Sequence, residues 1–178
     1  METAEILNKL KQAAPGSVLE KNRFGRSAHT CLWVEARLLP QVAAVLKTTP
    51  GIGLDWLENL SAMQMDEALV VTYFLRSTTS SKQFLILRVS TVPASASREV
   101  DLPSVSGVWA TATPFEIEIQ ELFGIRFLSA DGKQSHASSQ RLPKNWNGFP
   151  LRKSYVFPSS FLGISHSRPE ADATESGA

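Results

Sequence analysis

Apolar residues recur at helical spacing in two segments near the start of the chain. Residues 3–13 place Ile6, Leu7 and Leu10 on one side, and residues 37–47 carry a similar apolar stripe. Proline and glycine follow each segment, which predicts where each helix ends. The first part of the chain should therefore contain two amphipathic helices.

Shorter runs of apolar, β-branched and aromatic residues predict strands at 28–35, 69–76 and 84–89. A polar loop joins the last two as a hairpin. The run LVVTYFL is apolar almost throughout and indicates a central strand that is covered on both faces. Residues 54–65 are ambiguous, and we interpret them as a helical turn at 55–58 that leads into a strand.

A third helix is predicted from Pro114 to Phe123. Thr113 is the expected N-cap, and Glu116 lies three residues later, where its carboxylate completes a capping box. Proline suits the first helical position, and Gly124 suits the left-handed residue that ends a helix. Its apolar side consists of Phe115, Ile119, Leu122 and Phe123.

The opposite side of this helix carries Ile117 and Glu121, which we interpret as a second contact surface. The alternative is a single exposed isoleucine, which is common on protein surfaces. The carboxylates of Glu116, Glu118 and Glu121 are also candidates for general acid–base catalysis. Capping and the helix dipole explain them without catalysis, and we favour that interpretation.

The order of these elements predicts an α+β fold. Strands that follow one another closely cannot be parallel neighbours, so the sheet should be mainly antiparallel with helices packed on one face. Residues 21–26 are interpreted as a basic loop, and residues 93–103 as a loop without a core pattern.

The segment WNGFPLRKSY (146–155) combines aromatic and basic residues. Pro150 and Pro158 should keep residues 149–155 extended. An extended segment of this composition cannot form a core by itself, so it must lie across its own domain or across a partner. Residues 159–178 are small and polar, and we expect a disordered tail.

Composition excludes several classes of function. The net charge of +1 does not favour nucleic acid or an anionic membrane. The single cysteine, Cys31, excludes an internal disulfide and is expected in the core. His29 has no partner at metal-ligand spacing. No apolar run has the length of a membrane-spanning helix and no signal peptide is apparent, so an intracellular protein is expected.

Two segments resemble the signature of the 30 kDa subunit (C-type) family of respiratory complex I, a NADH-quinone oxidoreductase. The first, FEIEIQELFGIRF, matches the family pattern at Glu116, Glu118, Glu121, Leu122, Phe123, Gly124, Ile125 and Phe127. The second, LPKNWNGFPLRKSYVFP, matches it at Trp146, Gly148, Pro150, Leu151, Arg152, Lys153 and Tyr155.

The chain departs from the family pattern at three positions in these segments. Ile117 stands in place of arginine, Phe149 in place of histidine and Ser154 in place of aspartate. The family segment His-Pro-Asp-Leu-Arg-Arg is absent, and residues 129–136 stand in its place. The chain therefore resembles a divergent member, or a relative that serves a different complex.

The resemblance implies a ferredoxin-like α+β domain at 1–127, an extended docking arm at 128–158 and a tail at 159–178. It implies a non-catalytic, cofactor-free subunit of a NADH:quinone oxidoreductase, peripheral on the cytoplasmic side of the cell membrane. Expected partners are the quinone-site large subunit (the D type) and iron–sulfur subunits. Iron–sulfur clusters, FMN and quinone should be bound by those partners, and the membrane contacted only through the complex.

We expect the partner interface to include Ile117, Glu121, Trp146, Phe149, Leu151, Arg152, Lys153 and Tyr155. One alternative function is the equivalent subunit of a membrane-bound energy-converting hydrogenase or related dehydrogenase. The other is a stand-alone enzyme that uses the helix carboxylates.

Overall fold

The structure is a computed structural model that describes residues 3–27, 29–80, 83–95, 98–136, 141–143 and 145–165. Along the chain its elements are α1 (Thr3–Ala13), β1 (Val18–Arg23), β2 (Thr30–Val34), η1 (Ala36–Leu38), α2 (Leu39–Thr48), β3 (Trp56–Met65), β4 (Ala68–Arg76), β5 (Phe84–Thr91), β6 (Val100–Pro103), α3 (Ala112–Phe123), β7 (Ile125–Leu128), β8 (Ser160–Phe161) and β9 (Ile164–Ser165).

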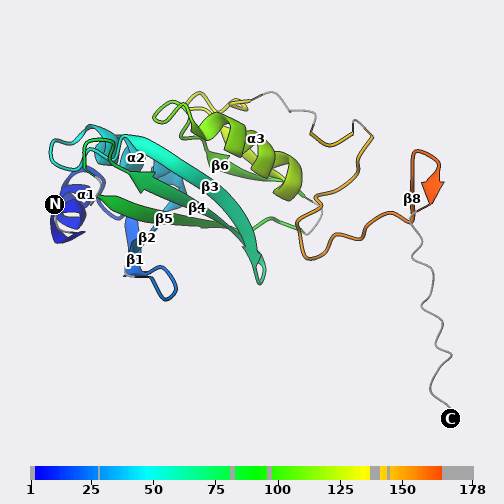
Figure 1. Cartoon of the computed structure of the whole chain (residues 1–178), viewed down its shortest axis with the longest axis horizontal. Helices are drawn as coiled ribbons and strands as arrows, with labels where there is room; N and C mark the ends of the chain where they lie inside the picture. The colour runs from blue at the N-terminus through cyan, green and yellow to red at the C-terminus, as the bar shows by residue number, and fades with distance from the viewer. Residues whose placement is uncertain are drawn as a thin grey trace, which may run out of the picture.

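The main sheet has five strands in the order β1-β2-β5-β4-β3 (Figure 1). The pairs β1–β2, β5–β4 and β4–β3 are antiparallel, and β2–β5 is parallel. The strands β6 and β7 form a separate parallel pair. The α+β prediction with a mainly antiparallel sheet is confirmed.

The helices pack on one face of the main sheet. In β4, alternate residues face the helices and are buried in one core with apolar residues of all three α-helices. This core includes Leu69, Val71, Tyr73 and Leu75 of β4, Leu10 of α1, Leu46 of α2, and Ile119 and Phe123 of α3. Cys31 is buried as expected, although it lies outside this core.

Two strands occur where we expected loops. Residues 21–23 belong to β1, which pairs along its length with β2, so only Phe24 to Arg26 of the expected basic loop form the turn. β6 has four residues and lies within the expected loop 93–103. Its pairing with β7 connects residues that are far apart in the sequence, and local patterns therefore do not predict it.

The helical turn expected at 55–58 is wrong, because β3 begins at Trp56. A register shift between Leu57 and Asn59 interrupts the ladder with β4. As a result Leu57 and Leu60, three residues apart, are both buried on the same side. This spacing is typical of a helix, and the bulge explains why the pattern was misleading.

The third helix was correctly predicted, but its start was not. It begins at Ala112, and Thr111 at the N-cap makes no side-chain hydrogen bond to the first turn. The predicted capping box at Thr113 and Glu116 is therefore wrong. The predicted end is confirmed, since Gly124 is left-handed with φ of 66° and its N–H donates to the Gln120 carbonyl at 2.8 Å.

The arm leads away from the sheet below the C-terminal end of α3 and ends in the small β8–β9 hairpin (Figure 1). Residues 149–155 were expected to be extended, but they form successive turns. The amide of Arg152 donates to the Phe149 carbonyl, and the amide of Tyr155 donates to the Arg152 carbonyl. Of the expected tail, residues 166–178 lie outside the described residues.

Candidate functional site

Phe149 lies directly against the end of helix α3. A β-carbon added to Gly124 would lie 2.4 Å from Cζ of the Phe149 ring, which is closer than atoms can approach. Gly124 is thus required both for its left-handed backbone and for the space that the ring occupies. The first family segment and the second therefore meet at this point.

Arg152 fastens the arm to the same helix end. Its Nε donates to the Phe123 carbonyl at 2.7 Å, and its Nη2 lies 3.4 Å from the Gly124 carbonyl. The guanidinium also lies 4.3 Å from the centre of the Phe149 ring. A cation at the C-terminus of a helix satisfies terminal carbonyls and complements the dipole. Burial lowers the pKa of Arg152, while the Glu99 carboxylate opposes this shift.

Backbone contacts complete this attachment. The amide of Leu151 donates to the Leu122 carbonyl at 3.1 Å, and the amide of Lys153 donates to Oε1 of Gln64 in β3 at 2.9 Å. The Leu151 side chain itself is exposed. Residues 149–153 are therefore bound to their own domain through the backbone and two side chains, while other side chains remain at the surface.

Beyond this anchor, the arm folds on an aromatic cluster around Trp146. The Trp146 ring stacks on Tyr155 at 6.2 Å, and it contacts Phe157 at 5.7 Å and Phe161 at 5.2 Å between ring centres. The Nε1 of Trp146 and the hydroxyl of Tyr155 are buried with no hydrogen-bond partner among the described residues. Buried donors are normally paired, so these two donors are left unsatisfied by the described residues of the cluster.

Apolar side chains project from the arm around this cluster. We call Val156, Phe157, Leu162 and Ile164 the apolar rim, and they are 85%, 56%, 72% and 64% exposed. Sequence reasoning did not include them in the interface. The sequence did contain a signal for this surface. The four apolar residues lie close together in a segment without helical or strand periodicity, where no core position explains them.

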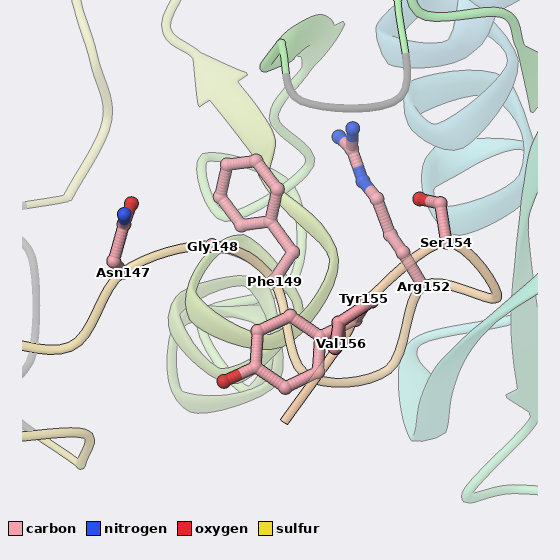
Figure 2. Close-up of a pocket in the computed structure, with 7 residues that line it drawn as sticks. All are labelled: Asn147, Gly148, Phe149, Arg152, Ser154, Tyr155 and Val156. Atoms are coloured by element: carbon pink, nitrogen blue, oxygen red, sulfur yellow. The ribbon is translucent and has the colours of Figure 1, made fainter. Parts of the chain in front are cut away.

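A pocket of about 430 Å³ opens between the anchor and the aromatic cluster. Figure 2 shows Asn147 at one end, Arg152 and Ser154 at the other, and the Phe149 ring between them. The walls combine a guanidinium, an amide and a hydroxyl with aromatic surface.

The carboxylate of Glu116 is fully buried and holds three separate segments together. It accepts hydrogen bonds from the Ser104 hydroxyl at 2.7 Å and the Val105 amide at 2.9 Å, and it lies 2.6 Å from Nε2 of His136. This structural role corrects the predicted capping role.

The other two helix carboxylates contact Arg141. Its Nη1 donates to Oε2 of Glu118 at 2.6 Å, and its amide donates to Oε2 of Glu121 at 3.2 Å. Ile117 is half-buried. Glu116 faces the interior while Glu118 and Glu121 face this loop, so the three carboxylates do not converge on a common cleft.

Two further findings concern the part of the chain that the structure describes. No group of three or more histidine, cysteine, aspartate or glutamate residues there is placed to hold a metal ion. No helix in the described ranges has the length and apolar content needed to cross a membrane.

Known proteins resemble this chain over most of its length. It is 28% identical to the C subunit of the NADH-quinone oxidoreductase of Roseiflexus sp. (strain RS-1), covering 86% of this chain and 83% of that one. It is 32% identical to the C/D subunit of the NADH-quinone oxidoreductase of Phocaeicola vulgatus, over 74% of this chain but only 24% of that longer one.

A solved structure and a family model agree. A trypsin-resistant fragment of Nqo5 has a similar fold, with a TM-score of 0.51 and 17% identity over 71% of this chain and 96% of the fragment. The model of the respiratory-chain NADH dehydrogenase 30 kDa subunit matches residues 32–160, which include most of the core, helix α3 and most of the arm. The chain therefore belongs to the respiratory-chain NADH dehydrogenase 30 kDa subunit family.

Proposed function

We propose that this chain is a non-catalytic subunit in the peripheral arm of a complex I-type NADH:quinone oxidoreductase, where its C-terminal arm docks on a neighbouring subunit. Its family membership supports the complex. The observation that carries the docking role is the exposed apolar rim on an arm whose base is bound to helix α3. Exposed apolar side chains gathered in this way are typical of protein-binding surfaces.

The proposed interface divides into anchors and contacts. Phe149 and Arg152 hold the arm in position from within their own domain. Trp146, Leu151, Lys153 and Tyr155, together with the apolar rim, contact the partner. Aromatic and arginine residues carry much of the energy of such interfaces. Ile117 and Glu121 flank the contact along helix α3.

The proposed principal partner is the quinone-site large subunit of the D type. Support comes from relatives whose name joins C and D in a single chain. Iron–sulfur subunits of the same complex are the proposed second neighbours. In this proposal FMN, the iron–sulfur clusters and quinone are bound by partners, this chain holds no cofactor, and the complex places it on the cytoplasmic side of the cell membrane.

A stand-alone enzyme has no observation in its favour. Glu116 is enclosed by three hydrogen-bonding groups, and Glu118 and Glu121 are engaged by Arg141. Glu118 lines a small pocket between α3 and β3, but neither Glu116 nor Glu121 joins it there, so the three carboxylates do not form a general acid–base pair around one substrate.

The test is purification of the tagged chain from detergent-solubilised membranes, followed by mass spectrometry. The unmodified chain should bring down a D-type large subunit with NADH-oxidising and iron–sulfur subunits. Val156→Asp together with Phe157→Asp should reduce this recovery about tenfold or more, because two carboxylates would be buried in an apolar interface. Val92→Asp is the matched control, since Val92 is 63% exposed and lies outside the arm.

Three outcomes contradict the proposal in different ways. A nickel–iron large subunit in place of the NADH-oxidising subunits would assign the chain to a hydrogenase-type complex. A chain recovered without partners would remove the proposed function altogether. Equal recovery of the rim variant and the control would leave the complex in place but exclude docking through the apolar rim.

A further inference from the structure

The face of the main sheet opposite the helices carries a second layer of buried residues. Val70, Ile86 and Cys31 are almost fully buried but do not belong to the core beneath the helices. They lie on neighbouring strands, since Ile86 is in register with Cys31 and with Phe74 of β4. Side chains on this face must therefore cover them, because the described helices all pack on the other face.

Four aromatic residues lie on this face, namely Phe24, Trp33, Phe74 and Phe84, and we call them the aromatic layer. Phe24 comes from the turn between β1 and β2, and its ring meets Phe74 edge-on at 5.7 Å. The Phe74 and Phe84 rings lie 6.5 Å apart. All four side chains are only half-buried, so the outer surface of the layer faces outward.

Arg88 lies in the middle of this layer. Its guanidinium carbon is 4.7 Å from the centre of the Phe24 ring and 5.4 Å from that of Trp33. Its Nε is buried and has no hydrogen-bond partner among the described residues. Two rings thus hold the cation in a fixed position and remove part of its water, while leaving a buried charged donor without an acceptor.

The other arginine of this face is paired. Arg76 lies over Phe84 at 5.6 Å, and its Nη2 is 3.2 Å from Oε1 of Glu58. In register, the nearest acidic residue to Arg88 is Glu20, which lies one strand beyond Trp33 and accepts a hydrogen bond from Asn22. Among the described residues, no carboxylate forms an ion pair with Arg88. A partly desolvated cation without a neighbouring carboxylate is unfavourable. The positive charge of Arg88 is therefore one that a carboxylate of a partner can complement.

We propose that this face binds a segment of a second protein subunit that brings an aspartate or glutamate carboxylate to Arg88 and packs apolar side chains on the aromatic layer. The planar guanidinium of an arginine presents paired N–H donors that match a carboxylate. The exposed side chains of Trp56, Met63 and Met65 on β3 extend the apolar surface beside it. This inference rests on the proposed function only in that the chain is a subunit of a larger complex.

The proposed surface is separate from the arm. The arm contacts helix α3 and Gln64, and Gln64 pairs with Leu69, which faces the helix-side core. Arg88 pairs with Thr72 on the opposite face of the same sheet. One subunit would thus contact neighbours on two sides of its sheet, and each contact can be removed independently.

The test uses the assembled complex with p-benzoylphenylalanine in place of Ser90. Ser90 is exposed, lies on β5 two residues from Arg88, and is in register with Val70 on this face. Illumination should produce an adduct with one neighbouring subunit, and the adduct peptide should contain an aspartate or glutamate beside apolar residues. Arg88→Gln should lower the adduct yield about tenfold, whereas Arg76→Gln, the control on the same face, should change it less than about twofold.

Each contrary result has a distinct meaning. An intact complex without an adduct at Ser90 would overturn this inference and leave the proposed function standing. An adduct whose yield does not change in Arg88→Gln would also overturn this inference. So would an adduct with a second copy of this chain, with residues 166–178 of the same chain, or with nucleic acid. If the chain does not purify with a complex at all, the proposed function fails first.

Discussion

The contact between Gly124 and Phe149 leads to a quantitative prediction. In Gly124→Ala the backbone would keep its left-handed φ of 66°, which costs a non-glycine residue about 1–2 kcal/mol. The new β-carbon would also displace the Phe149 ring, which it would otherwise approach within 2.4 Å. Loss of the half-buried ring contact and of its stacking on Arg152 adds about 1–2 kcal/mol.

We therefore expect Gly124→Ala to lower the free energy of unfolding by about 2–4 kcal/mol. For a chain of this length that corresponds to a fall in Tm of about 4–16 °C. Urea denaturation of the full chain, followed by circular dichroism, measures the change. Gly132→Ala is the matched control, because Gly132 has φ of 76° with no atom near the added β-carbon, and it should show the backbone strain alone.

A double-mutant cycle tests whether the contact between Gly124 and the Phe149 ring causes this destabilisation. In the background of Phe149→Ala, Gly124→Ala should cost only the strain of about 1–2 kcal/mol, so the two changes should couple by about 1–2 kcal/mol. Coupling below about 0.5 kcal/mol would show that the close approach of ring and backbone does not explain the glycine. The anchoring role of Phe149 would then be refuted.

Three further predictions follow from single groups. Arg152→Ala should destabilise the full chain by about 2–3 kcal/mol in urea denaturation, because charged hydrogen bonds to the end of α3 are lost. A change under about 0.5 kcal/mol would show that Arg152 does not anchor the arm to α3. Glu116→Gln should lower the free energy of unfolding by about 2–3 kcal/mol in the same assay, because the buried carboxylate loses charged hydrogen bonds. Glu118→Gln, at the surface, should change it by less than about 0.5 kcal/mol. Equal effects of the two substitutions would contradict the structural role of the buried Glu116 carboxylate. Hydrogen bonds from the Thr78 hydroxyl and amide lower the pKa of Asp55, so its stabilising effect is present above the unfolded-state pKa and is lost as pH falls through the lower folded value. In urea midpoints, the stability deficit of Asp55→Asn relative to the unmodified chain should therefore shrink steadily as pH falls from about 4. A deficit of unchanged size from about pH 7 down to the lowest pH at which the chain still folds would refute this.

Local patterns predicted the elements whose signals lie within a few residues of one another. The helices at 3–13 and 37–47 were predicted from helical periodicity. The hairpin of β4 and β5 was predicted from two runs of strand-forming residues joined by a short polar loop. Gly124 was predicted to end α3, since only glycine adopts a left-handed backbone without strain. The motifs around Gly124 and Arg152 also indicated the family.

Contacts between residues far apart in the sequence determined the features that local patterns did not predict. β6 exists because residues 100–103 pair with residues 125–128 after the intervening helix, and four residues carry no periodicity of their own. Glu116 is held by groups 11 to 20 residues away, so its distance from Thr113 suggested a cap that does not form. The anchoring contacts of Arg152 reach back 29 residues to Phe123. The motifs point to residues on helix α3 and the arm, but only contacts between segments distant in the sequence determine which of these residues are bound to their own domain and which remain exposed.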